Sequence, residues 1–192
     1  MNLPFRVPRS EALSPRHGVV DLMVALEVGG VAPDGPLLVG GASDPATGAL
    51  HLDAPLTRHR LDARVTRRAD ALSRQVRPGG IHPVVLRPDS RGVVELLAVW
   101  RLGAVPAPLH PTLTEAERAA AVEALSGRAV PGAQVVLWTS GTSGSPRGIA
   151  LGWDGIARHV EMVTERLSLR PGGDTWLASL SPAHVGGFML LV

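Results

Sequence analysis

From about residue 57 onward, apolar runs of strand length alternate with segments of helical periodicity, and this alternation constrains the fold more than any other feature. The first helix is the clearest, because apolar residues recur at helical spacing between a capping threonine and a Pro-Gly-Gly stop. They are Leu61, Val65, Ala69 and Leu72, between Thr57 and Pro78. One face of this helix is therefore predicted to be buried.

Further segments continue the alternation up to residue 138. They are a strand over 81–87, a helix capped by Ser90 and ended by Gly103, a strand over 105–109, a helix with Thr114 and Glu117 in capping-box spacing, and a strand over 133–138. Strands that alternate with helices in this way are joined by right-handed crossovers. The pattern predicts an α/β fold with a largely parallel sheet flanked by helices.

The first 56 residues are less regular. Apolar runs at 36–40 and 49–55 flank a cluster of Gly, Pro and Asp, which predicts a β-hairpin, and 19–28 could form a short helix. We therefore divide the chain into an N-terminal segment, 1–56, and a main domain, 57–192.

Composition narrows the classes of partner. The isoelectric point is high although the net charge is only +2. All 19 basic residues are arginine, and the chain contains no Lys, Tyr or Cys. Almost nothing therefore titrates between the α-amino group and the guanidinium groups, and a small positive excess raises the isoelectric point strongly. The arginines of the first helix alternate with acidic residues and lack aromatic neighbours, which is typical of a solvated helix face rather than a nucleic-acid site. No apolar stretch has the length of a signal peptide core or a membrane span. We expect a cytoplasmic protein that binds neither nucleic acid nor membrane.

A stretch rich in glycine and hydroxyl residues lies between apolar runs at 135–138 and 149–151. Its backbone N–H groups and hydroxyls can converge on an anion; the residues are Thr139, Ser140, Gly141, Thr142, Ser143, Gly144, Ser145 and Gly148. Arg147 adds a fixed positive charge suited to phosphate oxygens. A Walker loop needs a lysine and is therefore excluded, because the chain has none. The alternative to an anion site is a flexible Ser/Gly surface turn between two strands. The stretch predicts a polyphosphate site.

The string TSGTSGSPRG, 139–148, closely resembles the signature TSGTTGxPKG of the adenylate-forming superfamily, which includes acyl- and aryl-CoA synthetases, luciferases and peptide-synthetase adenylation domains. Segment 87–117, where a helix leads to Gly-Ala-Val and a Pro-containing turn, is similar as well. The resemblance implies that 57–192 is part of the AMP-binding N-terminal domain of such a ligase. Ser143 replaces a threonine and Arg147 a lysine, which keeps the hydroxyl and the charge.

A second motif, HVGG at 184–187, is similar to o-succinylbenzoate-CoA ligases of menaquinone biosynthesis. The resemblance implies that His184 donates a hydrogen bond to the substrate carboxylate and that Gly186 and Gly187 leave space for the acyl group. Without the resemblance, a lone histidine beside an apolar helix is more often a packed or solvent-facing residue. Another aryl or fatty acyl-CoA synthetase is the alternative.

The resemblance also implies a mechanism and a set of partners. The acid attacks the α-phosphate of MgATP, pyrophosphate leaves, and coenzyme A then takes the acyl group from the adenylate. The loop 139–144 would hold the β- and γ-phosphates, Arg147 would balance the departing pyrophosphate, and His184 would orient the carboxylate. The expected partners are ATP with Mg²⁺, coenzyme A and a small carboxylic acid. Whether the chain also forms a homodimer is left open.

Other parts of the family signature are missing from these 192 residues. There is no Tyr-x-x-Thr-Glu segment, no ribose-binding aspartate and no late lysine that touches the reacting phosphate. We therefore expect the chain to be the N-terminal part of a longer ligase and to be inactive alone. The alternative of a different class is a non-catalytic, nucleotide-binding remnant.

Overall fold

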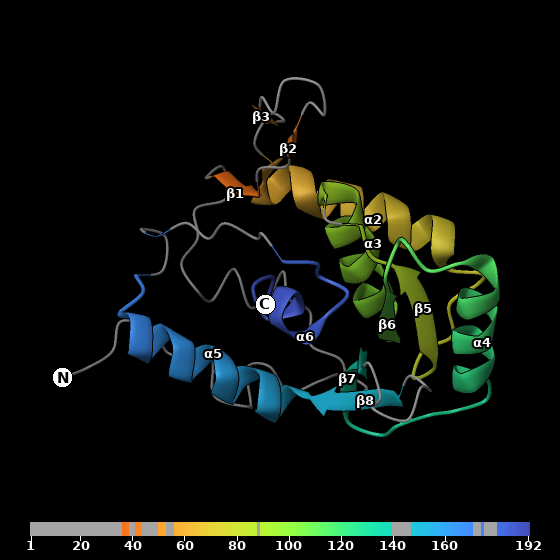
Figure 1. Ribbon diagram of the computed structural model, residues 1–192. Helices are drawn as coiled ribbons and strands as arrows, with labels where there is room; N and C mark the ends of the chain where they lie inside the picture. The colour runs from red at the N-terminus through yellow and green to blue at the C-terminus, as the bar shows by residue number, and fades with distance from the viewer. Residues whose placement is uncertain are drawn as a thin grey trace.

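The computed structural model describes residues 36–38, 41–43, 50–52, 56–87, 89–139, 147–170, 174 and 180–192. Its centre is a pair of parallel strands, β5 (Ile81–Val85) and β6 (Val105–Leu109), in register from Ile81 opposite Val105. Figure 1 shows this pair between α2 (Arg58–Leu72) and α3 (Ser90–Arg101) on one side and α4 (Glu115–Leu125) on the other. The predicted α/β fold, with parallel strands flanked by helices, is confirmed.

The first helix follows its sequence pattern closely. The Thr57 side chain accepts a hydrogen bond from the Arg60 N–H, and the four apolar residues of the predicted stripe are the buried ones: Leu61, Val65, Ala69 and Leu72. The helix ends at Leu72, earlier than the Pro-Gly-Gly stop, because the Ser73 hydroxyl donates to the Asp70 carbonyl and starts a turn there. Its exposed face carries Arg64 and Arg67, in agreement with a solvated helix surface.

The caps of the next two helices agree with the sequence in one case and differ in the other. In α4, Thr114 and Glu117 form the predicted capping box. In α3 the cap is Asp89 rather than Ser90, because the Asp89 carboxylate accepts from the N–H groups of Arg91 and Gly92 at 3.0 and 2.9 Å. Ser90 is instead the first residue of the helix.

The remaining strand pairs are antiparallel. Near the N-terminus β2 (Gly41–Ser43) pairs with β3 (Leu50–Leu52), and β1 (Pro36–Leu38) pairs with β4 (Leu56–Thr57), which crosses the predicted boundary between residues 56 and 57. The predicted helix over 19–28 lies outside the described residues. Beyond the parallel pair, β7 (Ala133–Thr139) and β8 (Arg147–Gly152) form an antiparallel hairpin. After the hairpin comes α5 (Trp153–Leu167), a helix that the sequence analysis did not predict.

One side chain of α3 links two elements that carry predicted site residues. The buried Trp100 donates its indole N–H to the backbone carbonyl of Gln134 in β7 at 2.6 Å. Its ring meets Phe188 edge to face, with centroids 6.0 Å apart. Phe188 belongs to the short helix α6 (Val185–Phe188) and is fully buried. Trp100 therefore packs β7 and α6 against the same helix.

None of the described helices is both long and apolar enough to cross a bilayer.

Candidate functional site

The β7–β8 hairpin carries the glycine- and hydroxyl-rich string at its open end. Thr139 and Arg147 are register partners there, and the Thr139 hydroxyl donates to the Arg147 carbonyl at 3.4 Å. The chain thus leaves β7 and enters β8 at neighbouring points, as a strand-loop-strand anion site requires. The five predicted phosphate-binding residues between them lie outside the described residues: Ser140, Gly141, Thr142, Ser143 and Gly144.

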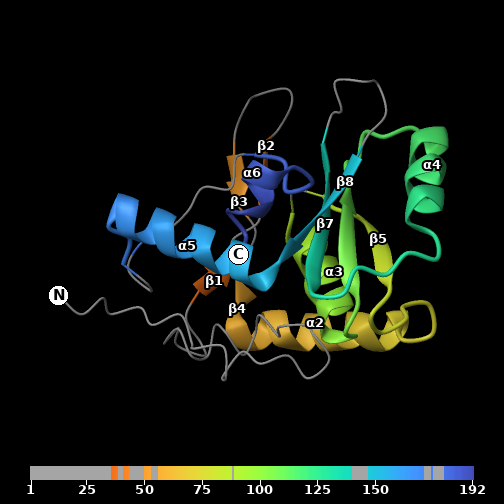
Figure 2. The ribbon, with the colours of Figure 1, turned by 90° about the horizontal axis from the view of Figure 1, so that it is seen from below.

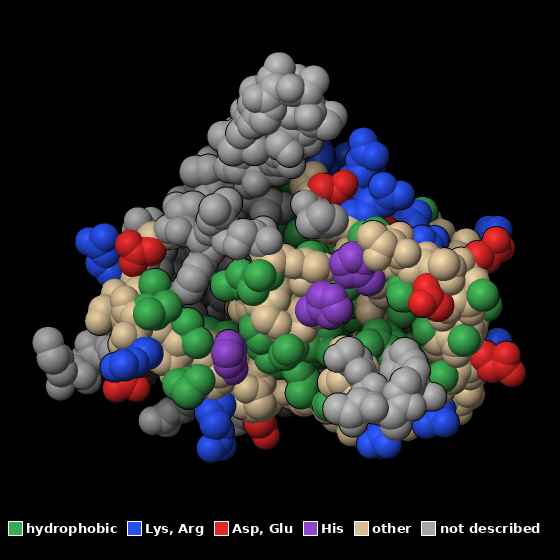
Figure 3. Space-filling view, in the orientation of Figure 1, with side chains coloured by type: hydrophobic (Ala, Val, Ile, Leu, Met, Phe, Trp, Pro, Cys, Tyr) green, Lys and Arg blue, Asp and Glu red, His purple; other side chains and the backbone are tan. Residues whose placement is uncertain are grey.

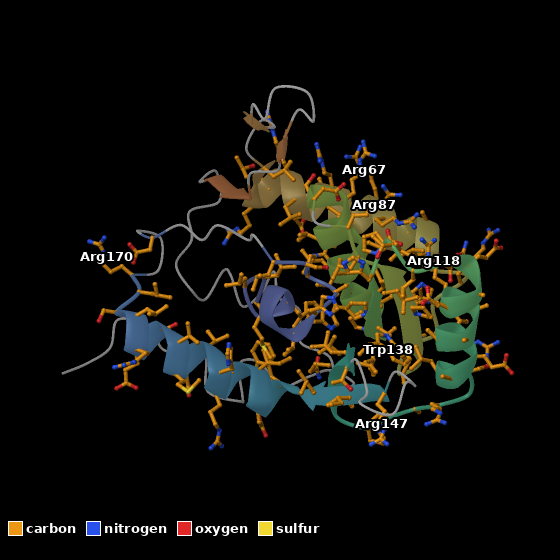
Figure 4. The ribbon with its side chains drawn as sticks, viewed as in Figure 1. Arg67, Arg87, Arg118, Trp138, Arg147 and Arg170 are labelled. Carbon is orange, nitrogen blue, oxygen red and sulfur yellow. The ribbon has the colours of Figure 1, made fainter. Side chains whose placement is uncertain are left out.

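The two faces of this hairpin differ in character. Trp138 and Gly148 are opposite each other, and a Cβ at Gly148 would come within 3.0 Å of a Val136 methyl group, so glycine allows close packing at this position. Trp138 packs against the apolar cluster under α4, and its indole N–H is buried without a partner in the described part of the chain. Arg147 is exposed, and Figure 4 shows it pointing outward at the edge of the molecule. Its guanidinium is therefore accessible to an anion.

His184 lies where two elements meet. It is the exposed N-cap residue of α6, and its ring is 5.4 Å, centroid to centroid, from the ring of His110, the residue that follows β6. Neighbouring histidine side chains are visible near the centre of the face in Figure 3, beside hydrophobic side chains. In Figure 2, α6 lies on the same side of the molecule as the open end of the hairpin. The sequence analysis missed His110, because no local pattern connects it with His184.

The two glycines after His184 have different surroundings. Gly187 is buried, and a Cβ there would lie 2.1 Å from the Ser181 carbonyl oxygen, so close backbone packing already requires glycine. Gly186 is exposed and lines a groove of about 480 Å³ between α5 and α6. Most other groove residues are apolar, among them Val160, Val163, Leu169, Val185 and Met189. A groove with this lining is suited to an apolar group, and its edge includes Val185, the residue after His184.

No group of three or more His, Cys, Asp or Glu side chains that could hold a metal ion occurs among the described residues.

Several solved structures share this arrangement of strands and helices. The O-succinylbenzoate coenzyme A synthetase MenE from Bacillus subtilis, in complex with AMP, matches with a TM-score of 0.59 at 22% identity, over 72% of this chain and 47% of that one. The same protein in complex with ATP and magnesium ion gives 0.62 at 19% identity, over 72% and 48%. The chain has the fold of part of an adenylate-forming ligase.

A second ligase is equally similar. ATP-bound MatB from Rhodopseudomonas palustris matches with a TM-score of 0.60 at 20% identity, over 88% of this chain and 42% of that one. The chain thus spans less than half the length of these ligases. No protein-family model matches the chain, and no curated protein sequence does either. The likeness to MenE and MatB is one of fold, and it does not separate the MenE branch from the MatB branch.

Proposed function

We propose that this chain supplies the ATP-phosphate loop and the acid-binding wall of an acid–CoA ligase, which activates a carboxylic acid as its adenylate and passes the acyl group to coenzyme A. The observation that carries the proposal is the β7–β8 hairpin. Its open end holds the TSGTSGSPRG string between Thr139 and Arg147, in a chain with the fold of part of an adenylate-forming ligase.

The proposed roles follow from what each group can do. Thr139 and the residues 140–144 would donate hydrogen bonds to the β- and γ-phosphates, and the exposed Arg147 would balance charge on the departing pyrophosphate. His184 would orient the acid's carboxylate toward the α-phosphate. These groups position reactants and neutralise charge, and no covalent step on the protein is needed.

For the acid we propose o-succinylbenzoate, and hence a place in menaquinone biosynthesis. Two features support an aromatic or other compact apolar acid: the HVGG motif at 184–187 and the apolar groove beside Gly186. The similarity of fold to MatB keeps another acid–CoA ligase as the alternative.

The first experiment is calorimetric titration of the chain with MgATP. Arg147→Ala removes a charge-assisted phosphate contact and should weaken binding about tenfold or more, because such a hydrogen bond contributes about 1.5–3 kcal/mol. Arg166→Ala, at another exposed arginine in the last turn of α5, is the matched control and should bind like the wild type. If Arg147→Ala leaves MgATP affinity unchanged, or if the wild type does not bind MgATP, the proposal is wrong.

A second experiment addresses the acid. Ligand-observed NMR of the MgATP-saturated chain would compare o-succinylbenzoate with a long-chain fatty acid. Binding of the fatty acid alone would exclude o-succinylbenzoate and favour a fatty acyl-CoA synthetase. Binding of MgATP with no acid bound would favour a non-catalytic nucleotide-binding remnant.

A further inference from the structure

His110 presents an imidazole beside His184 from a different part of the fold. We propose that His110 is a second acid-recognition residue, whose Nε2–H acts together with the His184 ring as a pair of donors for the substrate carboxylate. The inference rests on the proposed function, because it assigns a further residue to the same acid site. Its basis is the contact between the two rings, 5.4 Å apart at their centroids and inclined by 33°.

The surroundings of His110 fix which of its nitrogens can donate. The Thr112 backbone N–H donates to Nδ1 at 3.3 Å, and the Thr112 hydroxyl oxygen lies 2.6 Å from the same nitrogen. A backbone N–H can only donate, so Nδ1 is an acceptor and the neutral ring carries its proton on Nε2. The turn after β6 therefore holds the ring by one nitrogen and leaves the other as a donor.

The position of His110 in the fold suits a binding residue. All five residues of β6 are buried, and His110 is the half-buried residue that follows the strand. Ligands of open α/β sheets bind at the carboxyl ends of their parallel strands. His184, at the start of α6, brings the second ring to this end, close to the groove lined by Gly186.

The chemistry of the pair favours an anion with two acceptors. Each imidazole can donate one N–H, and a carboxylate, which has two oxygens, can accept from two donors whose rings are 5.4 Å apart at their centroids. Within the described part of the chain, neither ring is hydrogen-bonded or ion-paired to an Asp or Glu side chain. A substrate carboxylate would supply the negative partner that the described residues do not.

Two substitutions separate a donor from a structural support. His110→Gln places an amide N–H near the position of Nε2 and gives up the Nδ1 acceptor. His110→Asn places an amide oxygen near Nδ1, where it can still accept from Thr112, and has no donor near Nε2. His59→Asn, at an exposed histidine on α2, is the control.

The assay is an NMR titration of each variant with o-succinylbenzoate in the presence of MgATP, followed through the imidazole resonances of His184. We expect His110→Gln and His59→Asn to bind the acid within about threefold of wild type and His110→Asn to bind it at least about tenfold more weakly, the loss expected for one charge-assisted hydrogen bond.

Three results would contradict the inference. The first is that His110→Asn binds the acid with wild-type affinity. The second is that His110→Gln and His110→Asn lose equal affinity for the acid, which would indicate a supporting role in the turn. The third is that the resonances of His184 do not respond to the acid in a chain that binds MgATP. The first two leave MgATP binding and the response of His184 intact and so refute the role of His110 alone, whereas the third would also refute the proposed role of His184. Failure of the wild type to bind MgATP would instead refute the proposed function on which the inference rests.

Discussion

Alanine at position 187 should destabilise the chain, whereas alanine at position 186 should not. In Gly187→Ala the new Cβ would lie 2.1 Å from the Ser181 carbonyl oxygen and 2.8 Å from that of Leu180. Both distances are shorter than 3.0 Å, a separation below which Cβ atoms are essentially never found in proteins, and both oxygens belong to the backbone and cannot rotate away. Relief therefore requires α6 to move from the 180–181 turn by close to an ångström, which disturbs the packing of Phe188 on Trp100.

Overpacking of this kind costs about 1–3 kcal/mol. For a chain of this length, each kcal/mol lowers the melting temperature by about 2–4 °C, so Gly187→Ala should melt about 2–12 °C below wild type. Amide exchange gives a local measure, because the Phe188 N–H donates to the His184 carbonyl at 2.8 Å and should lose about tenfold or more of its protection.

Gly186→Ala is the matched control one residue away. Its Cβ would meet only the flexible end of the Leu180 side chain, at 3.4 Å. Alanine also favours helix over glycine by about 1 kcal/mol, so this variant should melt at or above the wild-type temperature. Equal melting temperatures and equal Phe188 exchange in the two variants would refute the packing argument for Gly187.

Three further predictions concern caps, core and pH. Asp89→Ala should lower the free energy of unfolding by about 1 kcal/mol in urea, whereas Ser90→Ala should be nearly neutral, because Asp89 accepts the two orphan N–H groups of α3. Trp100→Phe keeps an aromatic ring but loses the buried indole hydrogen bond, and should cost about 1–3 kcal/mol by the same denaturation measurement. The backbone N–H of Thr114 and, to a smaller extent, the Thr114 hydroxyl donate to the Glu117 carboxylate and lower its pKa. The capping box therefore stabilises the folded chain above the ordinary glutamate pKa, and this stabilisation is lost as the pH falls through the lowered pKa of Glu117. In a carbon-13 NMR titration, Thr114→Ala should raise the Glu117 pKa toward its ordinary value.

Much of the fold could be predicted because it depends on local patterns. The buried stripe of α2 follows from helical periodicity, the capping box of α4 from the spacing of Thr114 and Glu117, and β6 from an apolar run of strand length. Gly103 adopts φ +73° after α3, as expected for a residue that ends a helix. In each case the pattern that predicts the element lies within a short stretch of neighbouring residues, so it can be recognised in the sequence.

The errors and omissions have physical reasons. Asp89 and Ser90 are both good caps, and the choice between them depends on which residue takes the extended conformation before the first turn. The start of α5 was not recognised because Gly152 caps it without a side-chain hydrogen bond.

Contacts between distant segments were beyond any local pattern. His110 and His184 meet only because the end of β6 and the start of α6 lie at the same place in the folded chain. The different surroundings of Gly186 and Gly187 likewise depend on the 180–181 turn rather than on the HVGG motif itself.

The double contact of Trp100 affects how mutational data on this chain should be interpreted. A single buried side chain holds the strand that precedes the proposed phosphate loop and the helix that follows His184. In a saturation scan scored by binding of MgATP and of the acid, substitutions at position 100 would weaken the two proposed binding functions together, which is the result normally ascribed to a residue that contacts both ligands. A parallel scan scored by abundance would separate the two explanations, because substitution of a core residue lowers abundance and binding together.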